Sequence, residues 1–272
     1  MQNKTNANKN KKSMKPVYKP YLKGNVVSKA AAKRAGKVLG FVFMFIFIYL
    51  MLGGALTFEN NALRIAANAG LLLAGAMLLY NEGANQGETD VGFGEIAQKR
   101  LEEGKNVPAS EYDLCFHPMK GVYTAALGAL PIFLVCLVFS FVAQKQGYVL
   151  GVLPSWVSSY ESQPEVAQAL AYYSASSPMT LEDVLRVIVR MIIFPFVTMA
   201  GVNSNDAMYL VDKLSPILCL TMPAAYAVGY LRGPFLRALV HGNIRMSHRK
   251  HKRREQKARK ERRMQMEKKE LI

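Results

Sequence analysis

The stretch Val38–Phe58, VLGFVFMFIFIYLMLGGALTF, decides the class of this protein. It holds 21 residues and no charged side chain. At a helical rise of about 1.5 Å per residue, this length matches a bilayer hydrocarbon core of about 30 Å. The stretch is too long, and starts too far from Met1, to be a cleaved signal peptide. It therefore predicts a membrane-spanning helix.

Further apolar segments follow at 62–80, 122–143 and 215–231. The short link ENN at 59–61 predicts that the first two spans form an antiparallel hairpin. Within 62–80, small residues recur every four positions and predict a face for helix packing, made of Ala62, Ala66, Gly70 and Ala74. Together the four segments predict an all-α integral membrane protein with a membrane domain over 38–231.

Charge is distributed unevenly along the 272 residues, whose formal net charge is +16. Residues 1–37 carry 11 Lys/Arg and no acid, and residues 232–272 carry 15 Lys/Arg and four Glu. Residues 38–231 carry nine Lys/Arg and 15 Asp/Glu. This pattern predicts a flexible basic N-terminal tail and a basic helical C-terminal tail. By the positive-inside rule both tails are cytoplasmic, and we expect the protein in the plasma membrane.

The two long polar loops differ in charge as well. Residues 81–121 carry four Lys/Arg, whereas residues 144–179 carry only Lys145. The positive-inside rule therefore places the first loop in the cytoplasm and the second outside. A helix is predicted within the cytoplasmic loop, near Val91–Glu103.

The segment 181–201 decides the number of spans. The sequence TLED at Thr180–Asp183 predicts a capping box, so a helix should begin at Leu181, with a break near Pro195. If this helix crossed the membrane, five spans would leave the basic C-terminal tail outside. We therefore predict four spans and a re-entrant or outer-surface helix over 181–201. The number of spans would also be even, with both tails on one side, if 62–80 did not cross the membrane.

Arg186 and Arg190 are the strongest candidates for a functional site. They lie four residues apart and so project from one face of the helix. An arginine inside a membrane segment costs roughly 2.5–3.5 kcal/mol on insertion scales, so each needs a partner or water. The two arginines either line an outward-facing anion site or pair with Glu182, Asp183 or lipid headgroups. Asp206 and Asp212, just after this helix, are either further members of such a site or solvated loop residues, and the loop is the expected place.

The run SHRKHKRREQKARKERR at Ser247–Arg263 contains ten Lys/Arg. It has no aromatic residues to stack on bases, so sequence-independent phosphate contact is the most it offers to nucleic acid. Near an inner leaflet each cation contributes roughly 1 kcal/mol of attraction to anionic lipid. We expect contacts with anionic lipid, an acidic partner, or RNA or the ribosome, through Arg249, Lys250, Lys252, Arg253, Arg254, Lys257, Arg259, Lys260, Arg262 and Arg263.

The preceding residues, Phe235–Met246, alternate apolar side chains with Arg237, His241 and Arg245. This pattern predicts a helix that lies in the inner membrane interface and turns its cations toward headgroups.

No G-x-S-x-G, H-E-x-x-H or P-loop motif occurs, and Cys115 with His117 makes only half of a zinc site. The sequence therefore predicts no catalytic residue, cofactor or metal ligand. Three function classes stay open: a non-enzymatic scaffold or assembly factor with a membrane-protein partner or a second copy, a transporter or channel component with a site at Arg186 and Arg190, and a membrane-embedded lipid-modifying enzyme. The scaffold requires the fewest unseen residues.

Overall fold

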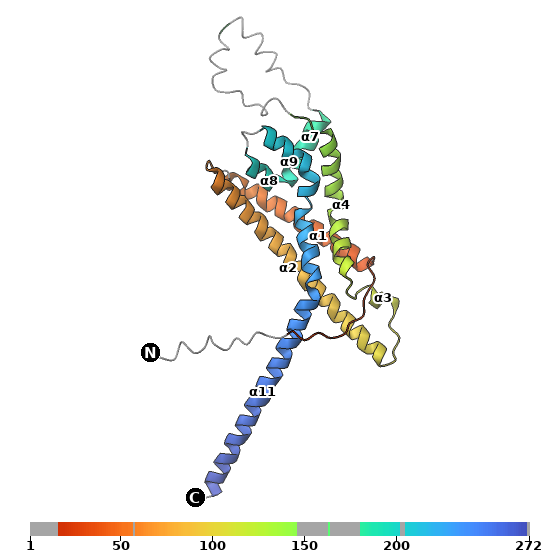
Figure 1. The fold of residues 1–272 in the computed structure, drawn as a ribbon, viewed down its shortest axis with the longest axis vertical. Coiled ribbons are helices and arrows are strands. Elements are labelled where there is room, and N and C mark those ends of the chain that lie inside the picture. Colours follow the sequence, from red (N-terminus) through yellow and green to blue (C-terminus); the bar gives the residue numbers. More distant parts are fainter. Residues whose placement is uncertain (1–15, 57, 146–162, 164–179, 202–204, 271–272) are drawn as a thin grey trace, which may run out of the picture. The chain divides into compact units, whose positions relative to one another are not determined.

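The computed structural model describes residues 16–56, 58–145, 163, 180–201 and 205–270. Every regular element in these ranges is helical, as predicted (Figure 1). The predicted outer loop lies almost wholly outside the described residues. The elements are α1 (Lys29–Leu52), η1 (Gly53–Leu56), α2 (Asn61–Glu102), α3 (Ala109–Tyr112), α4 (Pro118–Val142), α7 (Leu181–Ile192), α8 (Phe194–Ala200), α9 (Asn205–Leu218), α10 (Thr221–Leu231) and α11 (Gly233–Glu270).

Four helical stretches within the described ranges are long and apolar enough to cross a membrane. They are Lys29–Leu52, Asn61–Glu102, Pro118–Val142 and Asp206–Leu231. Each coincides with one predicted apolar segment, so the number of long apolar helices is confirmed. The fourth stretch consists of α9 and α10 together.

The chain divides into two compact units. The unit that contains both termini, the terminal unit, comprises Met1–Ala31, Tyr80–Tyr123 and Ala227–Ile272. The central unit comprises Ala32–Leu79 and Thr124–Tyr226. Most of the apolar part of α2 therefore belongs to the central unit, and its polar part to the terminal unit.

The helix α2 continues to Glu102, so the helix predicted near Val91–Glu103 is confirmed, whereas residues 81–90, which were expected to form a loop, are helical as well. This stretch contains several glycines, each of which weakens a helix by about 1 kcal/mol relative to alanine. Two of them instead allow close packing in the terminal unit. A Cβ atom added to Gly87 would lie 2.3 Å from the carbonyl oxygen of Tyr230, and one added to Gly94 would lie 2.7 Å from that of Leu22.

An extended segment, residues 16–25, precedes α1 and packs on other parts of the terminal unit. The backbone N–H of Val17 donates to Ala238 O and that of Leu22 to Gly94 O, both at 3.0 Å. Further along, Gly24 N–H donates to Phe116 O at 3.0 Å. Residues 29–37 belong to α1, so the flexible tail predicted over 1–37 does not extend through the described part of that range.

In the central unit, α7, α8 and α9 pack on one another, and α8 also contacts η1 (Figure 1). The α7–α8 junction lies at Ile193, so the predicted break near Pro195 is confirmed. A buried polar network connects α1, α2 and α8. The Thr198 hydroxyl donates to Asn68 Oδ1 at 2.8 Å, and Tyr49 OH hydrogen-bonds to the same Asn68 oxygen. This network satisfies polar groups among otherwise apolar helices.

Candidate functional site

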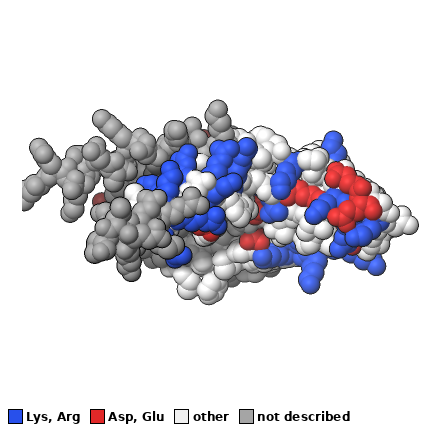
Figure 2. Space-filling model, turned by 90° about the horizontal axis from the view of Figure 1, so that it is seen from below, with Lys and Arg blue, Asp and Glu red and all other residues white. Residues whose placement is uncertain are grey.

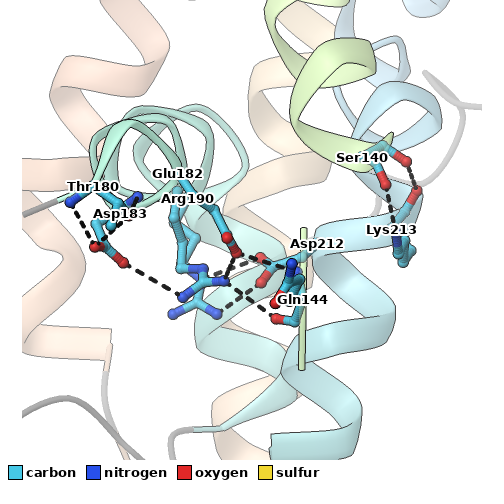
Figure 3. A network of polar contacts seen from close by, with 9 residues as sticks. Ser140, Gln144, Thr180, Glu182, Asp183, Arg190, Asp212 and Lys213 are labelled. Atoms are coloured by element: carbon cyan, nitrogen blue, oxygen red, sulfur yellow. Dashed lines mark hydrogen bonds and ion pairs between the residues drawn. The ribbon is translucent and has the colours of Figure 1, made fainter. Parts of the chain in front are cut away.

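The helix that carries the two candidate arginines begins at the predicted capping box. Asp183 N–H donates to Thr180 Oγ1 at 3.3 Å, and Thr180 N–H donates to Asp183 Oδ2 at 3.1 Å (Figure 3). Hydrogen bonds from the Thr180 hydroxyl and backbone hold the pKa of the Asp183 carboxyl below its ordinary value. This local motif starts α7, which packs on α9.

Arg190 lies against a carboxylate of α9. Its Nη2 donates to Asp212 Oδ2 at 2.8 Å and its Nε donates to Asp212 Oδ1 at 3.1 Å (Figure 3). This is the two-pronged geometry in which guanidinium and carboxylate pair best. Asp212 is only 2% exposed, so the structure corrects its expected place in a solvated loop.

Arg186 is 3% exposed and is surrounded by acceptors. Its Nη2 donates to Glu182 Oε1 and, at 3.2 Å, to the carbonyl oxygen of Gln144, which follows α4. Asp183 Oδ1 lies 3.8 Å from its Nη1. The Gln144 N–H in turn donates to Glu182 Oε1 at 3.2 Å. Its Nε is the one atom of this guanidinium that is buried without a partner among the described residues.

A second pair of contacts ties α4 to α9 beside the arginines. Lys213 Nζ donates to Ser140 O at 2.7 Å, and the Ser140 hydroxyl donates to Lys213 O at 2.8 Å (Figure 3). Three carboxylates thus face two guanidinium groups, and the network joins α4, α7 and α9. Because the carboxylates already neutralise the cations, this arrangement holds helices together and leaves little positive charge for an anionic ligand.

The small-residue face predicted on α2 is not covered by any helix in the described part of the chain. Its members Ala62, Ala66, Gly70 and Ala74 are all exposed. The close approach occurs one residue later, where a Cβ atom added to Gly75 would lie 2.2 Å from Phe45 and 2.7 Å from Met222. The helix rotation that buries Asn68 brings Gly75, not the predicted face, against α1 and α10.

The terminal unit contains a fully buried ion pair that sequence reasoning missed. Lys120 Nζ lies 3.1 Å from Asp90 Oδ2, and both side chains are 0% exposed. Lys120 also donates to the carbonyl oxygens of Asp113 at 2.7 Å and Cys115 at 3.1 Å. Tyr230 OH donates to Asp90 Oδ2 at 2.6 Å. No sequence signal marks these residues, because 30 residues separate the ion pair and 140 separate Tyr230 from Asp90.

Aromatic rings exclude water from this ion pair. Phe116 stacks on Tyr230 with ring centroids 5.1 Å apart, and Tyr21 meets Phe116 edge-on at 5.9 Å. Phe116 and Tyr230 form one buried cluster with Val91, and the partly buried Tyr21 packs against it. Burial, opposed in part by the charge of Lys120, raises the pKa of the nearby Cys115 thiol. The thiol therefore stays protonated and inert, and it donates to Glu111 O at 3.2 Å.

The first turns of α11 lie against α2 through ion pairs. Arg237 donates to Glu88 and Glu95, each at 3.1 Å, and His241 Nε2 lies 2.7 Å from Glu95 Oε1. Burial works to lower the pKa of the Arg237 guanidinium, but its bonds to Glu88 and Glu95 outweigh this effect and raise it. The structure thus corrects the expectation that Arg237 and His241 face lipid headgroups.

A groove adjoins these pairs, lined by the extended segment at Lys19 and Pro20 and by residues of α2 and α11. Its unfilled space, including the part open to solvent, is about 810 Å³. Opposite charges face each other along it, so the groove does not favour a strongly charged ligand.

Within the part of the chain that the structure describes, no group of three His, Cys, Asp or Glu side chains is placed to bind a metal ion. No protein-family model matches the chain, and no curated protein or solved structure is detectably similar to it.

Proposed function

We propose that this chain is a multi-pass plasma-membrane scaffold or assembly factor that holds an acidic partner protein through the basic half of α11. Four spans and two cytoplasmic termini form the proposed topology. It is supported by the four long apolar helices and by the basic residues at both ends of the chain.

The observation that carries the proposal is the contrast between the two halves of α11. The first half is anchored, since Ala238 is 2% exposed and Arg237 is paired with two carboxylates. In the second half, every residue from 247 to 262 is exposed. Figure 2 shows Lys and Arg side chains in several patches among uncharged residues, and Asp and Glu side chains in fewer places.

The exposed half of α11 is polar on all sides, so it has no apolar face to insert into a bilayer. A flat leaflet would meet only one side of such a helix, whereas an acidic protein surface can enclose several. An anchored helix with cations on all sides therefore favours a protein partner over lipid.

The short helices support a non-crossing segment over 181–201. α7 has 12 residues and α8 has seven, which correspond to lengths of about 18 Å and 10 Å. Each is shorter than the hydrocarbon core of about 30 Å. The carboxylate partners of Arg186 and Arg190 weigh against the transporter hypothesis, because that hypothesis needs free cations in a cavity.

Cysteine labelling tests the topology. A thiol reagent that does not cross membranes should label Asp206→Cys in intact cells and should label Arg249→Cys only after permeabilisation. Both positions are exposed, so the side of the membrane on which each cysteine lies, rather than its burial, decides whether it is labelled. Labelling of Arg249→Cys from outside would contradict the proposal.

Photo-crosslinking in native membranes tests the partner. A photoreactive side chain at Gln256, inside the basic run, should capture an acidic protein. Each exposed ion pair contributes up to about 1 kcal/mol, so Arg253→Gln with Lys257→Gln should lower adduct yield up to about 30-fold. Lys99→Gln with Lys105→Gln removes the same charge elsewhere and should leave the yield unchanged. Adducts to RNA, to lipid or to a second copy would replace the acidic protein as partner.

A further inference from the structure

Arg64 is half-buried, and it differs from Arg186 and Arg190 because no carboxylate among the described residues pairs with its guanidinium. Among the described residues its Nε atom is buried without a hydrogen-bond partner, and no carboxylate forms an ion pair with it. The side chain is seated on Gly201, at the C-terminal end of α8, in the central unit. A Cβ atom added to Gly201 would lie 2.5 Å from Arg64 Nη2, and the φ of +80° at Gly201 also favours glycine. The guanidinium is therefore held in place without a hydrogen-bond acceptor among the described residues.

The neighbours of Arg64 indicate its depth in a bilayer. Arg64 lies in the first turn of α2, where the apolar segment of that helix begins. Leu63 is 52% exposed and Ile65 is 48% exposed, so in a membrane both side chains contact acyl chains. A guanidinium at the end of a span lies at the level of the headgroups. The acceptor abundant there is the phosphodiester, whose oxygens fit the planar fork of arginine.

An apolar groove lies farther along the same helices. Its walls include Phe45 of α1, Leu72 of α2, and Pro195 and Phe196 of α8. The enclosed cavity is small, about 30 Å³, and the unfilled space with the open part included is about 340 Å³. Residues 64, 68 and 72 follow one another at four-residue spacing, so they share one side of α2. Leu72 lies about 12 Å from Arg64 along the helix axis. The cation and the apolar groove therefore both lie along α2 and α8. They are about as far apart as the phosphate and the acyl chain of a phospholipid.

We propose that Arg64 and this groove form a binding site for a membrane phospholipid, with the phosphate on the guanidinium and an acyl chain along the groove. The site rests on the membrane insertion proposed above, but it does not depend on the partner of α11. It is distinct from the paired arginines of α7, whose charges are already neutralised.

The test uses the full chain purified in a phosphate-free non-ionic detergent. Dioleoylphosphatidylglycerol is titrated in, and bound lipid is counted by native mass spectrometry. Arg64→Gln should weaken binding at least tenfold, whereas the control Lys99→Gln, which removes one exposed cation from the polar part of α2, should bind as the wild type does. Leu72→Trp keeps the cation but fills the groove, so it should also weaken binding. Binding to Arg64→Gln as tight as to the wild type would overturn the proposal.

Two further ligands test the contributions of the phosphate and of the acyl chain separately. Dioleoylglycerol lacks the phosphate and inorganic phosphate lacks the chain, so each should bind at least tenfold more weakly than the phospholipid. Inorganic phosphate that bound equally well would overturn the phospholipid assignment, as would a photo-adduct from position 64 to a protein carboxylate.

Two other variants keep the test decisive. If Arg64→Gln does not fold, Arg64→Lys, which keeps the charge without the fork, should bind more weakly than the wild type; equal binding would count against the site. Arg253→Gln with Lys257→Gln should leave lipid binding intact, so failure of this site and failure of the α11 proposal give different results.

Discussion

Lys120→Met is expected to lower the free energy of unfolding by about 3–5 kcal/mol, the range for removing one partner of a buried ion pair. The substitution leaves the Asp90 carboxylate, which is 0% exposed, without its cation. It also removes the donor to the carbonyl oxygens of Asp113 and Cys115. Methionine is similar in length to lysine, so the loss reflects charge and hydrogen bonding more than a cavity.

Equilibrium unfolding in mixed micelles, followed by helical circular dichroism, measures this effect. Lys105→Met is the matched control, because Lys105 pairs with Glu103 while 67% exposed, and such pairs contribute about 0–1 kcal/mol. Asp90→Asn combined with Lys120→Met removes both charges and keeps an acceptor for Tyr230, so it should recover part of the loss. Equal stability of the Lys120 and Lys105 variants would refute a structural role for the buried pair.

Arg190→Met is expected to destabilise the protein by about 2–4 kcal/mol. The physical reason is again an uncompensated carboxylate, since Asp212 is 2% exposed. The range lies below that for Lys120 because the Arg190 side chain is 22% exposed and solvent screens part of its charge. Arg190→Lys keeps the charge but loses the two-pronged contact, so its cost should be smaller.

The same unfolding measurement applies to the Arg190 variants. Asp212→Asn together with Arg190→Met should be more stable than Arg190→Met alone, because no buried charge then remains unpaired. A variant that unfolds like the wild type but loses transport of a solute would contradict the structural role and revive the transporter hypothesis.

Local patterns account for the parts of the central network that sequence predicted. The capping box spans four consecutive residues, and Glu182 lies one helical turn before Arg186, so both contacts follow from helix geometry alone. The contact between Arg190 and Asp212 joins different helices. Nothing in the sequence indicates that pairing, and the pattern around Asp212 suggested a loop.

The glycine-containing stretch of α2 shows the opposite error. Residues 81–90 were predicted to form a loop, and Gly87 and Gly94 both lower helix propensity, yet α2 runs through both glycines. The close approach of other backbone segments at these positions requires glycine and stabilises the helix through packing. Packing against other segments therefore outweighs the low helix propensity of these glycines.

The sequence by itself determined the all-helical class, the number of long apolar helices, the start of α7 and the basic ends of the chain. Each depends on the length, periodicity or charge of one continuous segment. Only the tertiary structure decided that Lys120 meets Asp90, that Arg190 meets Asp212, that Arg237 faces carboxylates, and that Arg64 has no partner within the described chain. Buried ion pairs form where separate helices are brought together, because a charge removed from water must find its counter-charge in three dimensions rather than along the chain.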